Sequence, residues 1–278
     1  MYIKNQYSVI LSISSDIGFE IAKSWIGKKK IIGTYLTSSR KTQFLKSKGV
    51  DLFKVDFKKK KNIDRFCKEI SKKEVTNIIS TVGSQDPIGE FNKVNLDDWT
   101  DSIFVNAINQ IRCIVNLLKN KKKKVKIVLF AGGGTNNATK YYSAYTLSKI
   151  MLIKFTELID FELKNVSCSI IGPGWVKTKI HESTLNNKLK AGQNYKRTKD
   201  QLNSSNCVPI SKVVECVNWA LKQKKSVISG RNISLVYDDW GNKKLTKLLL
   251  KDKNIYKLRR FGNERLIREK KINEKNFN

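Results

Sequence analysis

Tyr145 and Lys149 stand four residues apart in a segment whose apolar spacing predicts a helix. Side chains four apart lie one turn apart on the same face of a helix. A free phenol has a pKa of about 10, and a neighbouring ammonium group favours the phenolate and lowers that pKa. Tyr145 could then donate a proton to a carbonyl oxygen or accept one from an alcohol. The pair therefore indicates acid–base chemistry on a carbonyl or an alcohol, provided that the surrounding elements place it in a site.

The surrounding sequence alternates short apolar runs with longer amphipathic segments. We expect strands at Ser8–Leu11, Ile31–Tyr35, Leu52–Val55, Asn77–Val82, Val125–Phe130, Ser167–Ile171 and Ile233–Val236. We expect helices at Gly18–Ile26, Thr42–Lys48, Asn62–Lys72, Leu96–Lys119, Ser143–Leu163 and Ser211–Lys222. Strands that alternate with helices predict an α/β fold, with a doubly wound parallel sheet and helices on both faces.

The chain shows no internal linker rich in Gly, Pro or Ser, so residues 1–240 are expected to form a single domain. Within it, the polar and weakly periodic segment 175–209 is the kind of long loop that serves as a lid over a site. Residues 241–278 are very basic and are expected to form a C-terminal extension that begins with a helix.

The composition limits the classes of function. The formal net charge is +31, from 55 Lys and Arg against 24 Asp and Glu, and this excess alone would suit a nucleic-acid partner. Only nine of the basic residues are Arg, which is the better residue for forked contacts with bases and phosphates, and the lysines are spread along the whole chain. We therefore expect no specific nucleic-acid partner.

The cysteines and the N-terminal segment point to a reducing compartment. The five cysteines show no CxxC spacing and accompany a single His, so we expect buried free thiols and no metal site. The chain enters the first apolar run at Tyr7, which leaves no space for a cleaved signal, and no apolar run has the length of a membrane span. These features predict a cytoplasmic protein without a membrane span.

The first expected strand is followed by Leu11-Ser-Ile-Ser-Ser-Asp-Ile-Gly18 at the start of a helix. At such a turn, backbone N–H groups and a helix N-terminus can hold the diphosphate of a dinucleotide. The spacing resembles TGxxxGIG, the cofactor fingerprint of the short-chain dehydrogenase/reductase family, and indicates its compact single-domain branch with a Rossmann-type fold. Ser12 and Asp16 stand where that fingerprint has its first and second Gly. The resemblance implies cofactor contacts from Ser12, Ser14, Ser15, Asp16, Ile17 and Gly18.

The second expected strand ends without the acidic residue that would bind an NAD ribose. Thr37, Ser38 and Arg40 follow it instead and could hold a 2′-phosphate, so we favour NADP over NAD as the cofactor. By resemblance, Asp56 matches the family's acidic residue beside the adenine. Gly83 matches the last residue of the family's Asn-Asn-Ala-Gly segment.

Further matches surround the expected catalytic pair. Asn106 matches the family's helix Asn, which is implied to position a water molecule beside the lysine. The resemblance spans about residues 6–238 and implies that Tyr145 is the acid/base and that Lys149 lowers its pKa and binds the cofactor ribose. A second segment carries the family's Pro-Gly-x-Val-x-Thr, which is implied to meet the nicotinamide. Its matching residues are Pro173, Gly174, Val176 and Thr178.

One family residue is missing from the chain. The family has a Ser thirteen residues before the Tyr, which orients the substrate oxygen, and here that position is Gly132. Losing one such donor costs on the order of 10²–10³ in rate. Three interpretations stay open: backbone N–H groups of Gly132–Gly134 replace the hydroxyl, Thr135 or Ser143 turns toward the substrate, or the site binds nucleotide without catalysis. The residues expected beside a substrate are Gly132, Gly133, Thr135, Tyr142 and His181, and for His181 the competing interpretation is an exposed position in the loop.

These observations predict an NAD(P)-dependent oxidoreductase that transfers hydride between a nicotinamide cofactor and a small carbonyl or alcohol compound. The resemblance implies a homodimer or homotetramer formed through segments 96–119 and 143–163. The alternative is a catalytically impaired protein of the same fold that acts as a nucleotide-binding or interaction module.

Overall fold

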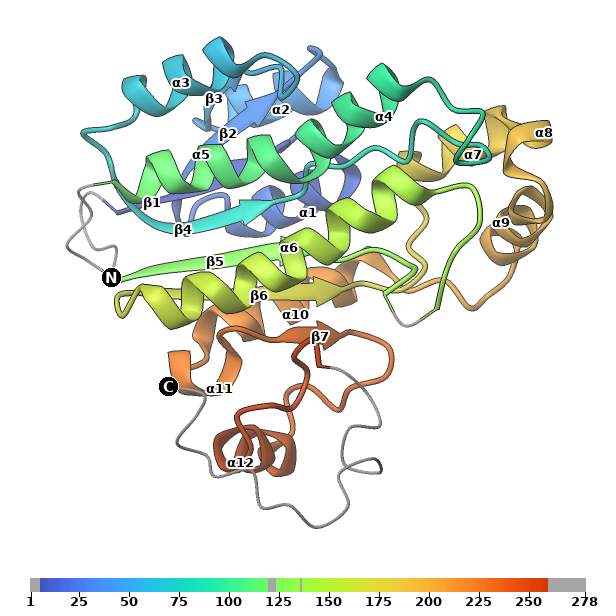
Figure 1. Ribbon diagram of the computed structural model, residues 1–278. Coiled ribbons are helices and arrows are strands. Elements are labelled where there is room, and N and C mark those ends of the chain that lie inside the picture. Colours follow the sequence, from blue (N-terminus) through green and yellow to red (C-terminus); the bar gives the residue numbers. More distant parts are fainter. Residues whose placement is uncertain (1–5, 120–123, 136, 260–278) are drawn as a thin grey trace.

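The computed structural model describes residues 6–119, 124–135 and 137–259, which form one seven-stranded sheet between two layers of helices (Figure 1). Neighbouring strands are parallel throughout, in the order β3-β2-β1-β4-β5-β6-β7. The strands are β1 (Gln6–Leu11), β2 (Lys30–Tyr35), β3 (Asp51–Lys54), β4 (Glu74–Ser80), β5 (Val125–Phe130), β6 (Val166–Gly172) and β7 (Asn232–Ser234). The predicted doubly wound α/β fold is confirmed, and the chain changes direction across the sheet between β1 and β4, where such sheets bind ligands.

Helices cover both faces of the sheet, which explains why β1, β5 and β6 are apolar along most of their length. Phe66, Ile114 and Leu152 pack on one face, and Ile21 and Val217 pack on the other. The larger helices are α1 (Asp16–Trp25), α2 (Arg40–Ser47), α3 (Lys60–Glu69), α4 (Leu96–Ile103), α5 (Asn109–Leu118), α6 (Ser143–Glu162), α10 (Ile210–Lys222) and α12 (Lys243–Lys251). None of the helices in the described ranges is both long and apolar enough to cross a membrane.

The predicted helix over 96–119 is interrupted in the structure. It consists of α4, one π-helical turn at Phe104–Ile108 and α5. Asn106 lies in this turn and is fully buried. π-Helical turns are frequent at functional sites because they change the direction of side chains without ending the helix. The apolar spacing could not reveal the turn, since one extra residue barely alters a helical pattern.

The segment predicted as a long loop over 175–209 is mostly helical. A 3₁₀ turn at Lys179–His181 leads into α7 (Glu182–Asn186), α8 (Lys188–Ala191) and α9 (Gln193–Asn203). These helices bury only small side chains, Thr184, Ala191 and Thr198, so the sequence carries little apolar periodicity. Figure 1 shows α7, α8 and α9 together beyond the end of the sheet that lies beside the start of α6.

A buried arginine holds the C-terminal segment on the sheet. Arg231, which precedes β7, is 2% exposed, and its guanidinium group donates to the carbonyl oxygens of Leu249, Asp252 and Ile255. The last carbonyl groups of a helix have no partners within the helix, so these bonds satisfy the end of α12. The expected C-terminal helix is therefore present and is packed against the domain.

We expect Arg231→Met to lower the free energy of unfolding by about 2–4 kcal/mol, because three carbonyl groups lose their donor while the apolar length of the side chain is kept. Urea unfolding measures the change. The control is Arg65→Met on α3, an exposed arginine paired with Glu69 at 3.8 Å, which should change stability by less than about 0.5 kcal/mol. Equal stability of the Arg231 variant and the parent would show that the C-terminal segment packs on the domain without the Arg231 hydrogen bonds.

Candidate active site

The turn between β1 and α1 is held together by hydroxyl groups. Ser12 has a φ of 60°, a left-handed conformation that favours glycine, and its N–H donates to the Thr34 hydroxyl at 2.9 Å. The Thr81 hydroxyl lies 2.9 Å from the carbonyl oxygens of both Leu11 and Ser12, and the Ser15 hydroxyl donates to it at 2.9 Å. The turn thus holds Ser12 in a backbone conformation that favours glycine, although Ser12 carries a side chain.

Gly18 is required by the packing beneath this turn. A Cβ at Gly18 would lie 2.7 Å from the Ser12 carbonyl oxygen and 2.8 Å from the hydroxyl oxygens of Ser15 and Thr81. Ser15 caps α1 by accepting the Gly18 N–H at 3.0 Å. The N-terminus of α1 is therefore drawn close to the ends of β1 and β4, which is the geometry that suits a diphosphate.

Asp16 is the first residue of α1, and its carboxylate links three segments of the chain. It accepts the backbone N–H of Lys179 at 2.8 Å and forms an ion pair with Lys41 of α2. Partial burial by itself would raise the pKa of this carboxyl, but the hydrogen bonds and charges of Lys41 and Lys179 hold the pKa below its usual value. Asp16 is therefore ionised at neutral pH.

The residues expected near a 2′-phosphate lie together at the start of α2. Thr37, Ser38 and Arg40 are all exposed, just beyond the carboxyl end of β2. Ser39 caps the helix, with its hydroxyl accepting the Thr42 N–H at 3.4 Å. One strand further out, the Asp56 carboxylate accepts the Lys58 N–H at 2.9 Å, so it is held in a turn at the same edge of the sheet.

The segment that follows β6 contains the Pro-Gly-x-Val-x-Thr match. Gly174 has a φ of 72°, and a Cβ there would lie 2.5 Å from Val236 Cγ2, so only glycine fits this turn. Val176 is buried, and its carbonyl oxygen accepts the Thr178 hydroxyl at 3.4 Å. Pro173 precedes the turn at the end of the strand.

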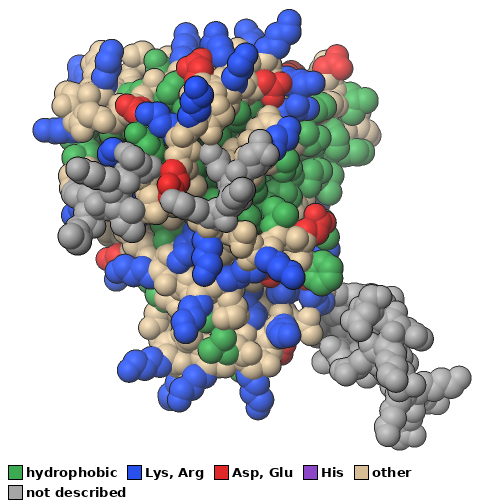
Figure 2. Space-filling view, turned by 90° about the vertical axis from the view of Figure 1, so that its left-hand side faces the viewer, with side chains coloured by type: hydrophobic (Ala, Val, Ile, Leu, Met, Phe, Trp, Pro, Cys, Tyr) green, Lys and Arg blue, Asp and Glu red, His purple; other side chains and the backbone are tan. Residues whose placement is uncertain are grey.

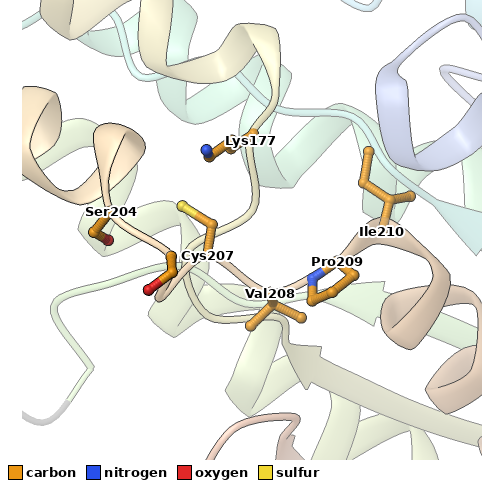
Figure 3. Close-up of a pocket in the computed structure, with 7 residues that line it drawn as sticks. Lys177, Ser204, Cys207, Val208, Pro209 and Ile210 are labelled. Carbon is orange, nitrogen blue, oxygen red and sulfur yellow. The ribbon is translucent and has the colours of Figure 1, made fainter.

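A cavity of about 220 Å³ adjoins this segment, where the chain returns from α9 to α10 (Figure 3). None of the residues expected to be catalytic lines it. Figure 3 shows Lys177 on one side of the cavity and Cys207, Val208 and Pro209 on the other. The lining residues are Lys177, Ser204, Ser205, Cys207, Val208, Pro209 and Ile210.

Asn106, Gly83 and Lys149 meet at the carboxyl end of β4. The Asn106 side chain donates to the Ser84 carbonyl oxygen at 2.9 Å and accepts the Ser84 N–H at 2.8 Å. A Cβ built on Gly83 would lie 3.7 Å from both Asn106 Oδ1 and Lys149 Nζ. The π-helical turn therefore directs the Asn106 side chain to the same side of Gly83 as Lys149 Nζ.

The Tyr145 phenol rests directly on Gly132. A Cβ at Gly132 would lie 2.5 Å from Tyr145 Cε1 and 2.6 Å from the phenol oxygen, closer than real carbon contacts allow. Lys149 Nζ lies 5.4 Å from the centre of the Tyr145 ring. The phenol thus occupies the space that a serine side chain at position 132 would need.

The other hydroxyl groups considered for the missing serine have different partners. The Thr135 hydroxyl donates to the Gly132 carbonyl oxygen at 3.3 Å. Ser143 accepts the Trp99 indole N–H at 3.0 Å, at the start of α6. Gly133 is exposed, and a Cβ there would meet no atom within 4 Å among the described residues.

Burial shifts the pKa values of Tyr145 and Lys149 in opposite directions. It raises the pKa of Tyr145 to about 12 and lowers the pKa of Lys149 to about 8. We expected the ammonium group to lower the pKa of the phenol, but the removal of both groups from water is the larger effect. At neutral pH the phenol is therefore protonated and the lysine is still largely cationic.

The segment 175–209, predicted as a lid, is attached to the start of α6 through Tyr142. Tyr142 is buried, and its hydroxyl lies 2.8 Å from the Thr184 hydroxyl, which donates to Gln85 Oε1 at 2.9 Å. Burial raises the pKa of Tyr142. Tyr142 packs in one cluster with Ala191 of the lid and Tyr145. It therefore joins the segment 175–209 to Tyr145.

His181 is not an exposed loop residue, which was the competing interpretation of its position. Its ring stacks on Trp175 with the ring centres 5.2 Å apart, and Nε2 lies 3.1 Å from the Val176 carbonyl oxygen. Burial lowers the pKa of this imidazole. The neutral ring therefore donates through Nε2 and secures the turn after β6.

Several residues of the site escaped the sequence analysis. Thr81 ties the nucleotide turn, Gln85 and Thr184 fasten the lid, and Lys41 pairs with Asp16. Each acts through a partner at least 25 residues away in the sequence, which no local motif could identify. Only the short distance between Thr81 and Gly83 offered a signal, since residues at the carboxyl end of an expected strand lie at the ligand edge.

We expect Lys149→Met to raise the free energy of unfolding at pH 7 by about 1–3 kcal/mol. The pKa of Lys149 falls from 10.5 to about 8 on burial, so the unfolded chain binds more protons between these pH values and the charged lysine opposes folding below pH 8. The gain should shrink as the pH rises from 8 to 10.5. Urea unfolding at pH 7 and pH 10 measures it, with the exposed Lys212→Met as the control. A variant less stable than the parent at pH 7 would contradict this account.

The geometry can be compared with known proteins. The pattern that describes the short chain dehydrogenase family matches residues 6–189, which is more than half of the chain. None of the curated proteins matches the chain in sequence. A short chain dehydrogenase/reductase structure from Saccharomyces cerevisiae is similar with a TM-score of 0.75 and 16% identity, over 87% of this chain and 98% of that one.

Two further structures share the fold. An actinorhodin polyketide ketoreductase variant with NADPH has a TM-score of 0.70 and 17% identity, over 83% of this chain and 95% of that one. The ligand-free aldohexose dehydrogenase from Thermoplasma acidophilum has a TM-score of 0.67 and 15% identity, over 83% of this chain and 92% of that one. The family match supports an NAD(P)-dependent oxidoreductase, and these neighbours show the fold. With its parallel sheet, its glycine-dependent turn and the sequence match, this chain belongs to the short chain dehydrogenase family.

Proposed function

We propose that the protein transfers hydride between NADP(H) and the carbonyl or alcohol group of a small molecule. The observation that carries this proposal is the pairing of a half-buried Tyr145 with the buried Lys149 at the carboxyl end of the sheet, near Asn106. NAD is the alternative cofactor. NADP is favoured because the strand end that would need an acidic residue is followed instead by Thr37, Ser38 and Arg40.

The residues around the first turn fit a nucleotide. The close packing at Gly18 leaves the N-terminus of α1 facing the end of the sheet, and Ser12, Ser14, Ser15 and Ile17 belong to the same turn and helix start. The segment of Pro173, Gly174, Val176 and Thr178 would hold the nicotinamide, Asp56 the adenine, and Gly83 would border the ribose. A bound nicotinamide nucleotide supplies or accepts the hydride.

The protonation state of Tyr145 suits the reduction of a carbonyl group, in which the residue acts as a proton donor. With a pKa of about 12, Tyr145 keeps its proton at neutral pH and can donate it to the carbonyl oxygen of a substrate. The Lys149 ammonium then lies near the phenolate that remains and stabilises it. Asn106 forms two hydrogen bonds with the backbone of Ser84 and so fixes the chain beside Lys149, where Tyr145 would regain its proton.

The Gly at position 132 is proposed to be part of this arrangement. Because the phenol fills the place of a serine side chain, its hydroxyl is held where the serine would meet the substrate oxygen. The N–H groups of the Gly132–Gly134 loop, of which Gly133 is exposed, would supply a second donor, and Thr135, Tyr142 and His181 would border the substrate under the lid. Tyr142 is assigned to the substrate side because it contacts Thr184 of the lid, and His181 because it belongs to the lid segment.

Tyr145→Phe tests the function. It removes the proton donor but keeps the ring on Gly132, so turnover of NADPH with a panel of aldehydes and ketones should fall by at least 10³-fold while NADPH affinity, measured by calorimetry, changes by less than about threefold. Turnover unchanged in this variant would disprove the assigned role. Nucleotide binding without turnover in the parent protein would favour the catalytically impaired module, which the Gly at position 132 and the side chain at Ser12 support.

Gly132→Ser tests the proposal for the missing serine. If the loop only lacks a hydroxyl, the variant should gain about 10²–10³ in rate. We expect the opposite, a loss of at least tenfold, because the new side chain must displace the phenol. The same turnover assay measures it, and Gly133→Ser is the matched control because its Cβ meets open space. A gain of rate in Gly132→Ser would sink this interpretation.

We further propose a homodimer or homotetramer in the cytoplasm. Hydrophobic side chains are exposed along the outer faces of the helices that the resemblance assigns to subunit contact, including Val115 of α5 and Leu147, Met151 and Leu158 of α6. Figure 2 shows hydrophobic side chains gathered along the edge where α5 and α6 lie, whereas Lys and Arg are scattered over the rest of the visible face. That scatter argues against a specific nucleic-acid partner, and the five free thiols suit a reducing compartment.

A further inference from the structure

The carboxylate of Asp16 lies at the helix terminus that the proposed function gives to the nucleotide diphosphate. Asp16 opens α1, a helix of ten residues, and its side chain is 19% exposed. Its oxygens bind the Lys179 N–H and the Lys41 ammonium group. The helix N-terminus and these two partners are all donors that an anion would use.

These contacts connect the two walls between which a nucleotide would lie. Lys179 directly follows Thr178, the residue assigned to the nicotinamide, and it begins the 3₁₀ turn that leads into the lid. Asp16 belongs to the opposite wall, in the turn that ends at Gly18. The Asp16 carboxylate therefore connects the same two segments that a bound diphosphate would connect.

Lys41, the cationic partner of Asp16, lies near the expected 2′-phosphate site. Lys41 follows Arg40 in the first turn of α2, close to the exposed Ser38. While Lys41 is paired with Asp16, its charge is directed toward α1 rather than toward the exposed end of β2. Two negative groups near each other cost more free energy as water is excluded, so a diphosphate and the Asp16 carboxylate compete for the same donors.

We propose that Asp16 is an internal charge latch that lowers the affinity of the protein for its nucleotide and limits its preference for NADP over NAD. The proposal rests on the proposed function, because it concerns the same nucleotide site. A nucleotide binds when the carboxylate gives up Lys41 and the Lys179 N–H to it. Removing the charge of Asp16 leaves the helix terminus open and frees Lys41 for a 2′-phosphate.

Calorimetric titration with NADPH and NADH tests the latch. We expect Asp16→Asn to bind both nucleotides about tenfold more tightly than the parent at low salt, with the larger gain for NADPH. The gain should fall severalfold at 0.5 M salt, because charge repulsion near the surface is screened. Asp16→Gly, which places the fingerprint's own residue at this position, should behave in the same way and covers the case in which the Asn variant does not fold.

Two control variants separate the latch from general charge. Glu69→Gln removes an equal charge from an exposed ion pair at the far end of α3, and its affinity should stay within twofold of the parent. Lys41→Met in the Asp16→Asn background should remove the extra gain for NADPH and leave the gain for NADH.

The outcomes distinguish this inference from the proposed function. If the parent binds nucleotide and Asp16→Asn binds no more tightly, the latch is overturned and the proposed function stands. If both Asp16 variants bind nucleotide and the parent does not, the latch is strong enough to prevent nucleotide binding in the parent. If the parent and both Asp16 variants fail to bind either nucleotide at millimolar concentration, the proposed function fails, and the latch fails with it.

Discussion

The site depends on a contact that one additional carbon atom would prevent. The Tyr145 ring lies on Gly132 so closely that a Cβ would come within 2.6 Å of the phenol oxygen. The same packing removes the phenol from water and raises its pKa to about 12. The glycine in place of serine and the position of the tyrosine are therefore one structural feature. A change at either residue alters both the geometry and the protonation of the site.

The enclosure around the tyrosine has an energetic cost that the rest of the fold must offset. Lys149 is 3% exposed and carries a charge at neutral pH, although burial lowers its pKa to about 8. Asn106 and the backbone of Ser84 satisfy each other at the π-helical turn beside it. Ser12 adopts a conformation that suits glycine. Such local costs collect at functional sites and persist because the two-sided core holds the elements in place.

Polar contacts between distant segments connect the turn before α1, the start of α6 and the segment 175–209 that was predicted as a lid. Tyr142 reaches the lid through Thr184, three residues after the 3₁₀ turn that Asp16 holds by the Lys179 N–H. The start of α6 and the start of α1 are thus joined to the same short segment, and the ring of His181 stacks within it. The position of the lid is for this reason linked to both halves of the site.

The sequence by itself determined the order of strands and helices, because apolar periodicity is a local property that each segment carries. Only the resemblance of its motifs to the family grouped Asn106, Tyr145 and Lys149 into one expected site, because all three lie on helices whose packing the local pattern does not fix. Packing between residues far apart in the chain decided the rest. It placed the Tyr145 phenol against Gly132 and raised the pKa of Tyr145, where the local pair predicted a decrease. It also folded the weakly periodic segment 175–209 into helices. It also directed the Asp16 carboxylate to a backbone N–H 163 residues away, a contact that exists only once the sheet has brought both segments together.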